Sequence, residues 1–313
     1  MTITKTIATT IAAFALLTTS ALAADIVRKA PIKKAEPAPP PPCDLAFGGG
    51  VQSDYNFRGI SQTDKGPGVF AYVEPRCKVH PNIELYAGIW GWSTKLPTNP
   101  TGEFDLYGGI RPTIGPVAFD FGFMYYWYPR ETQQWFGNAA LTTLTTTPTI
   151  FGPFTLADTD FWEFYAKATW TVNDWLAISP YVYYDPSYLN SGAKGVYAGG
   201  TVKVTLPSAW FPSDWGMYVS GDVSHYWLGT VTAFGLPGFD LPDYTQWNVG
   251  FAVTYKVLTF DLRYYDTNLS PAQCFIVGGD PAGVTSGTGT SKWCDATVIA
   301  KLSFDMTLNN NIK

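Results

Sequence analysis

Charged side chains are scarce in this sequence, and histidines and long apolar runs are scarcer still. Charged residues make up 14% of the chain, the formal net charge is −5, and only two histidines occur, His80 and His225. Proteins that bind nucleic acid show basic patches, and this composition indicates none. Two distant histidines offer no cluster of metal ligands, so we expect neither a metal nor a cofactor. Beyond the first residues, no apolar run is long enough for a membrane-spanning helix.

The first residues, 1–23, have the three parts of a secretory signal peptide. Lys5 gives a basic start, residues 6–17 form an apolar stretch, and small residues precede Ala24. The stretch is too short to span a bilayer, and no stop-transfer pattern follows it. We therefore expect an exported protein that is cleaved between Ala23 and Ala24.

Residues 24–42 are rich in proline and lysine. Such a segment cannot fold alone and should run as an extended periplasmic tether. Contact with an anionic cell-envelope polymer and a plain solvated leader are both open interpretations. The remaining residues, 43–313, are long enough for one large β domain.

Apolar and polar residues alternate along most of residues 43–313, which predicts strands with one apolar and one polar face. Residues 83–89 and 298–306 show the pattern clearly. Most of the stretches have about ten residues, the length that a tilted strand needs to cross a bilayer, whereas soluble strands are shorter. The twelve predicted strands are 44–57, 68–76, 82–92, 103–112, 116–128, 160–171, 174–185, 195–206, 216–227, 244–256, 258–266 and 294–308.

The connections between these strands alternate between long and short. The links 129–159 and 267–293 are long, whereas 113–115, 172–174 and 256–257 are short. This alternation is typical of outer-membrane barrels, and an even number of strands places both termini in the periplasm. Aromatic residues reach 16%, which suits a surface in contact with lipid. We predict an all-β fold, a transmembrane antiparallel up-and-down barrel of about twelve strands in a Gram-negative outer membrane.

Four cysteines in an exported chain predict two disulfides, although free buried thiols are an alternative. Cys43 precedes the first predicted strand and Cys77 follows the second, so both lie at one end of neighbouring strands. Cys274 and Cys294 both belong to the last long loop or its edge. We predict the pairs Cys43–Cys77 and Cys274–Cys294.

Ionisable residues lie on the polar face of the predicted strands, which faces the lumen of a membrane barrel. Acids outnumber bases there, which predicts a lumen that mildly favours cations. The alternative is a network of ion pairs with no continuous path. The predicted pore-lining residues are Asp54, Arg58, Glu74, Glu84, Asp105, Arg111, Asp120, Glu163, Lys167, Lys203, Asp222, Lys256, Asp261, Arg263, Lys301 and Asp305.

These patterns favour a porin-like channel for passive diffusion of small hydrophilic solutes or ions, surrounded by outer-membrane lipid. One alternative is a non-conducting barrel whose external loops bind a partner. Another is a lipid-acting hydrolase built on His225, which is predicted to face lipid. Ser224 lies next to it in sequence, but adjacent strand residues face opposite sides, so the nucleophile would have to come from another strand. We assign no catalytic residue and do not expect an enzyme.

Residues 53–64, with the sequence SDYNFRGISQTD, resemble the N-terminal signature of the TorF-like porin family. Residues 103–109 and 125–129 are also similar to that family. The resemblance is strong over residues 45–130 and looser towards the end of the chain. It implies an outer-membrane β-barrel, and it carries no catalytic residues over to this sequence.

Overall fold

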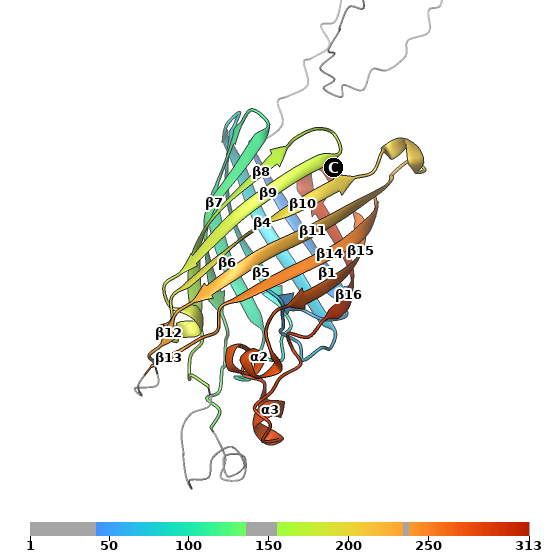
Figure 1. The fold of residues 1–313 in the computed structure, drawn as a ribbon. Coiled ribbons are helices and arrows are strands. Elements are labelled where there is room, and N and C mark those ends of the chain that lie inside the picture. The colour runs from blue at the N-terminus through green and yellow to red at the C-terminus, as the bar shows by residue number, and fades with distance from the viewer. Residues whose placement is uncertain (1–41, 136–154, 234–237, 313) are drawn as a thin grey trace, which may run out of the picture. The chain divides into compact units, whose positions relative to one another are not determined.

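The computed structural model describes residues 42–135, 155–233 and 238–312, and its main feature is a closed antiparallel β-barrel (Figure 1). Consecutive barrel strands pair with one another, and the first strand closes on the last. The predicted barrel of twelve strands is thereby confirmed. The strands are β1 (Cys43–Gln52), β4 (Gly68–His80), β5 (Ile83–Trp92), β6 (Glu103–Ile114), β7 (Val117–Trp127), β8 (Phe161–Thr171), β9 (Leu176–Asp185), β10 (Gly195–Thr205), β11 (Trp215–Leu228), β14 (Tyr244–Tyr255), β15 (Leu258–Thr267) and β16 (Thr297–Thr307).

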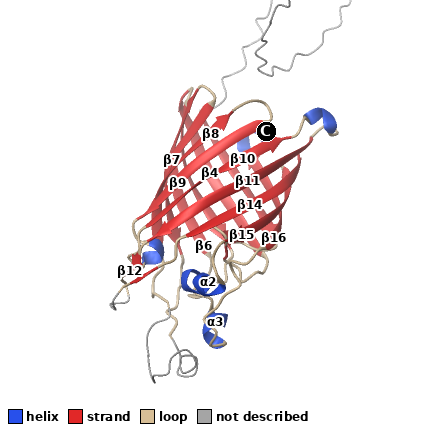
Figure 2. Cartoon of the chain, in the orientation of Figure 1, coloured by secondary structure: helices blue, strands red, loops and turns tan. Residues whose placement is uncertain are grey.

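The long connections lie at one end of the barrel and most of the short ones at the other, where residues 206–214 between the strands that end at Thr205 and begin at Trp215 form a longer link. We call the end where β1 begins and β16 ends the terminal end, and the opposite end, which has the long connections, the loop end. In the part of the chain that the structure describes, helices lie in the connections and after the last strand (Figure 2). The small elements are β2 (Asn56–Phe57), β3 (Ile60–Ser61), η1 (Tyr188–Asn190), η2 (Ser208–Trp210), β12 (Thr230–Val231), β13 (Phe239–Asp240), α2 (Pro271–Gly278), α3 (Pro281–Thr285) and α4 (Leu308–Asn311). Among the described residues, no helix has the length and apolar character needed to cross a membrane.

The two faces of the barrel wall differ sharply in character. Val249 and Val223 on the outer face are 53% and 60% exposed, whereas Glu163 and Ala252 on the inner face are fully buried. A soluble sandwich would bury the apolar face against a second sheet. Here the apolar side chains point away from the centre and the ionisable side chains point into it, which is the arrangement of a membrane barrel.

Exposed aromatic side chains gather near both ends of the outer face. Trp170, Trp175, Trp210, Trp215 and Tyr255 lie near the terminal end. Near the loop end lie Trp127, Tyr184, Trp227 and Tyr264. Aromatic girdles of this kind mark the two water–lipid interfaces of a transmembrane barrel.

Both predicted disulfides are present. Cys43 and Cys77 are register partners in β1 and β4, and their sulfur atoms are bonded at the terminal end. Cys274 in α2 is bonded to Cys294 at the other end of the last loop. The predicted signal peptide, the tether apart from Pro42, and residues 136–154 of the predicted loop 129–159 lie outside the described residues.

Candidate functional site: the barrel lumen

Residues 53–67, which we call the plug segment, leave β1 at the loop end and turn into the barrel. The sequence pattern predicted a strand over 44–57, but β1 ends at Gln52 and a small hairpin of β2 and β3 follows. Its two turn residues, Arg58 and Gly59, have φ values of 50° and 87°, as a type I′ turn requires. A Cβ atom on Gly59 would lie 2.4 Å from the side chain of Thr267, so the turn needs glycine here. Arg58 is therefore the tip of a hairpin rather than a residue of the wall, which corrects its predicted position.

Arg58 forms a buried ion pair with Glu163 on the far wall of the barrel. Its two terminal nitrogens donate to the Glu163 carboxylate at 2.7 and 2.6 Å, and the side chains are 5% and 1% exposed. Burial alone would lower the pKa of Arg58, but the charge and hydrogen bonds of Glu163 together with the nearby Tyr226 and Tyr126 outweigh it and hold that pKa well above its usual value. The pair fastens the plug segment across the lumen.

Aromatic rings surround the Arg58 guanidinium. Its central carbon lies 4.7 Å from the ring centre of Phe57, 4.9 Å from Tyr183, 4.3 Å from Tyr197 and 4.9 Å from Tyr226. Cation–π attraction is strongest where water is excluded, as it is here. Three of the four rings belong to β9, β10 and β11, so the hairpin tip is held by strands on the side opposite its origin.

Asp54 anchors the base of the plug segment. Its Oδ1 accepts hydrogen bonds from the hydroxyls of Ser61, at 2.6 Å, and Thr63, at 3.0 Å, whereas its Oδ2 is buried without a partner. Burial raises the pKa of Asp54, although the two hydroxyls oppose the shift. Like Arg58, Asp54 was predicted on a strand and belongs instead to the plug segment.

We expect Asp54→Asn to flatten part of the pH dependence of stability. A raised carboxyl pKa means that the folded state favours the neutral form of Asp54. The contribution of this group to stability is therefore complete below the ordinary aspartate pKa and is lost as pH rises through the raised value. Asparagine keeps the acceptor oxygen and carries no charge. Thermal midpoints in detergent at about pH 4 and pH 7 should therefore differ less in the variant than in the wild type. Asp174→Asn, at an exposed turn, is the control, and an equal change in both variants would contradict the prediction.

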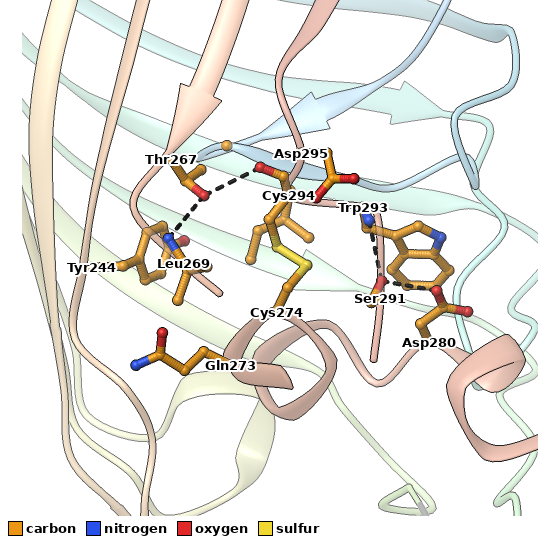
Figure 3. Close-up of a disulfide and its surroundings, with 12 residues drawn as sticks. Tyr244, Thr267, Leu269, Gln273, Cys274, Asp280, Ser291, Trp293, Cys294 and Asp295 are labelled. Atoms are coloured by element: carbon orange, nitrogen blue, oxygen red, sulfur yellow. Dashed lines mark hydrogen bonds between the residues drawn. A yellow bond between two sulfur atoms is a disulfide. The ribbon is translucent and has the colours of Figure 1, made fainter. Parts of the chain in front are cut away.

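We call the last loop, residues 268–296, the lid loop, and Figure 3 shows its disulfide with the surrounding residues. The Cys274–Cys294 disulfide joins the two ends of this loop, and both cysteines are buried. Next to Cys294, the carbonyl of Trp293 accepts a hydrogen bond from the Ser61 N–H, and the Trp293 indole donates to Asp64. The ammonium group of Lys65 donates to the Asp295 carbonyl. These contacts hold the plug segment against the lid loop.

The loop end of the lumen is filled around these two segments. Inward side chains from many wall strands are almost completely buried there, and aromatic rings predominate. Among them are Tyr126, Phe161, Tyr197, Tyr226 and Tyr244. Tyr55 of the plug segment stacks on Trp92 at 4.1 Å and donates to Glu103 at 2.5 Å. Within the described residues, the plug segment, the lid loop and these inward side chains fill the loop end of the lumen.

A network of predicted lumen residues occupies the β4–β7 side of the barrel. Arg111 contacts the carboxylates of Glu74, Glu84 and Asp120 at 2.8, 3.1 and 3.5 Å. Its guanidinium also lies 3.5 Å from the ring centre of Tyr86, which donates to Asp120. The predicted residues therefore form an ion-pair network on this side, as one of the sequence interpretations proposed.

A polar cavity of about 420 Å³ lies next to the plug segment, on the β9–β16 side of the barrel and opposite the β4–β7 network. Asn56 and Arg58 contribute to it from the plug segment. Its predicted residues are Arg58, Asp222, Asp261, Arg263 and Lys301, and tyrosines on the inner face of the wall line it as well. The side chains that line the cavity from the wall are Tyr181, Tyr197, Thr201, Tyr218, Ser220, Asp222, Gln246, Asn248, Asp261, Arg263, Tyr265 and Lys301.

The remaining predicted residues have varied positions. Lys256 does not line the lumen: it lies exposed in the β14–β15 turn with φ 52°, because the short connection takes the residue that was assigned to the strand. Lys167 lies over the rings of Tyr165 and Tyr183, and Lys203 over Tyr218. Asp305 accepts from the Tyr72 hydroxyl and Asp105 is buried, both on the inner face.

His225 and Ser224 lie on opposite faces of β11. Nδ1 of His225 is 2.8 Å from the Thr245 hydroxyl, and its ring packs on Trp227 at the outer face. Ser224 is buried inside and contacts Tyr197. One group that the sequence did not indicate is a set of three carboxylates in the β7–β8 connection, Glu131, Asp158 and Asp160, whose oxygens lie within 4.8 Å of one another.

Comparison with known proteins gives a partial family match and several structural likenesses. Residues 34–157, less than half of the chain, match a family described as a bacterial protein of unknown function (Gcw_chp). No curated protein matches the chain by sequence. The resemblance to the TorF-like family stays a prediction.

Three solved structures illustrate the structural matches of the chain. The KdgM porin in complex with disordered oligogalacturonate is 8% identical, with 83% of this chain and 98% of that chain covered and a TM-score of 0.40. An outer membrane channel from Pseudomonas putida F1 is 8% identical, with 86% and 97% covered and a TM-score of 0.43. LpxR from Salmonella typhimurium is 9% identical, with 83% and 99% covered and a TM-score of 0.41.

Proposed function

We propose that the chain is an outer-membrane channel of a Gram-negative bacterium that passes small hydrophilic solutes or ions through a narrow lumen. The observation that carries the proposal is the reversal of the two wall faces: apolar side chains point outwards, and charged side chains surround a polar cavity inside. This arrangement suits lipid outside and water inside. Both termini would then lie in the periplasm, and the loop end would face the outside of the cell.

The plug segment restricts the path in this proposal. It crosses the lumen and is fastened at Glu163 and beneath the lid loop, so the described residues represent a closed or strongly constricted state. Conduction therefore requires that the hairpin tip leave its aromatic cage. The barrel strands can stay in place during this movement, because Arg58 belongs to a connection and not to the wall.

We do not propose that the lumen prefers cations, although acids outnumber bases on its predicted face. Many of the acids, such as Asp54, Asp105 and Glu163, are buried at the closed loop end, where a diffusing ion does not meet them. The lipid-acting hydrolase is not favoured either, because His225 bonds to Thr245 while Ser224 faces the interior.

Single-channel recording in planar bilayers tests the proposed function. We expect the purified wild-type barrel to give rare or small current steps, since the plug segment narrows the lumen. The heat-denatured protein is the matched control and should give none. A complete lack of steps at every voltage, both in the wild type and in a variant whose plug segment is released, would favour the non-conducting surface barrel instead.

A further inference from the structure

The polar cavity next to the plug segment holds two carboxylates whose bonding capacity is already used. Asp222 accepts from the Tyr181 hydroxyl at 2.8 and 2.9 Å, from Thr201 at 2.8 Å and from the Gln246 amide at 2.8 Å. Asp261 accepts from Arg263 at 3.0 and 3.2 Å. Asp222 is 9% exposed and Asp261 is 6% exposed, so neither offers much to a solute.

The cations of the cavity are not equally engaged. Arg263 donates to Asp261, Asn248 and Ser220, so all three guanidinium nitrogens already have partners in the barrel wall. Lys301 is half-buried and is the register partner of Asp261, but its ammonium group has no hydrogen bond or ion pair with any other residue in the described part of the chain. An ammonium group has three donors and a full charge, so this side chain has unused capacity for an acceptor.

Neutral donors lie around the same cavity. The hydroxyls of Tyr218 and Tyr265 line it and donate to no other described residue. Lys203 does not line the cavity, but its ammonium nitrogen lies 4.1 Å from the ring centre of Tyr218, which does. The groups that the cavity can still offer are thus mainly donors, because the Asp222 oxygens are bonded to neutral donors whereas the Lys301 ammonium keeps its hydrogen-bonding capacity.

We propose that this cavity binds a small anionic solute, with the Lys301 ammonium as the charge partner and the Tyr218 and Tyr265 hydroxyls as flanking donors. The inference rests on the proposed channel and names the class of solute that the channel would prefer. It reverses the preference predicted from counting acids and bases, because most of the acids are buried or already bonded. The volume of about 420 Å³ lies within the range of small-molecule sites.

Calorimetric titration of the detergent-solubilised full-length protein tests the binding directly. Gluconate and sorbitol share a polyhydroxylated six-carbon chain and differ by one carboxylate, so they form a matched pair of probes. We expect saturable heat with gluconate and none with sorbitol. Lys301→Gln should weaken gluconate binding by about tenfold or more, the usual effect of losing a charged hydrogen bond. Lys256→Gln removes the same charge at the exposed turn and should leave binding unchanged.

Several results of this titration would overturn the inference. They are equal binding of gluconate and sorbitol, an absence of binding to either probe, and an equal loss in the Lys301 and Lys256 variants. A circular dichroism spectrum and a thermal midpoint like those of the wild type establish that the Lys301 variant is folded.

Ion selectivity separates this inference from the proposed function. Under a tenfold gradient of potassium chloride, we expect the reversal potential of the barrel to indicate a preference for chloride, and Lys301→Gln to reduce that preference. Current steps with a cation preference would overturn the inference and leave the channel in place. Gluconate binding without any current steps would overturn the channel and leave the anion site in place.

Discussion

Arg58→Ala is expected to turn a rarely open barrel into one that conducts for most of the time. Removing one partner of a buried ion pair leaves the other charge without compensation, which costs about 3–5 kcal/mol. The uncompensated group is Glu163, whose side chain is 1% exposed while the plug segment is in place. Releasing the segment lets water reach that carboxylate, so the cost falls on the closed state. A shift of roughly a hundredfold or more towards open barrels should appear as longer and larger current steps.

A double variant distinguishes the ion pair from the simple loss of bulk. Arg58→Met combined with Glu163→Leu replaces both charges by apolar groups of similar volume, which is often neutral for a buried pair. It should restore closure, whereas Arg58→Met alone should not. If the double variant conducts as much as Arg58→Met, the ion pair is not what holds the plug segment.

Val249→Arg should be the most destabilising single change on the outer face. Val249 lies near the middle of β14 and is 53% exposed on the apolar side of the wall. Arginine at the bilayer midplane of a transmembrane barrel costs about 2–4 kcal/mol, and the cost falls to about 0–1 kcal/mol near the interfaces. Reversible urea unfolding in lipid vesicles measures the difference.

Ile114→Arg is the control for this prediction. Ile114 ends β6 at the terminal end, is 69% exposed, and lies near the expected interface. Ile114→Arg should lower the free energy of unfolding by about 2 kcal/mol less than Val249→Arg does. Equal costs for the two variants, or a Val249→Arg protein that is stable in water without detergent, would contradict a lipid-facing outer wall.

The wall of the barrel could be predicted because it depends on patterns within each strand and on pairing between strands that are consecutive in sequence. A period of two fixes which side of a strand each residue takes, so residues such as Glu84 and Asp261 could be placed on the inner face. Neighbouring strands of the barrel are neighbours in sequence, which also made the pairing of Cys43 with Cys77 predictable. These inferences needed no knowledge of distant contacts.

The closed loop end could not be predicted in the same way. Residues 53–57 continue a strand-like pattern, and the turn at Arg58 and Gly59 gives only a weak signal for a hairpin. The contacts that draw this hairpin inwards come from Glu163, Tyr226 and the lid loop, more than a hundred residues away. A count of charges likewise cannot show which carboxylates are buried and which cations remain unpaired, as at Lys301.

The contact between the plug segment and the lid loop has a consequence for assembly. The wall grows by pairing strands that follow one another along the chain, which is entropically cheap. The seal at Ser61 instead depends on Trp293, which belongs to the final connection, so it becomes possible only once nearly every strand is available. We therefore expect the molecule to pass through an unsealed intermediate as it inserts, and to become tight only at its last step.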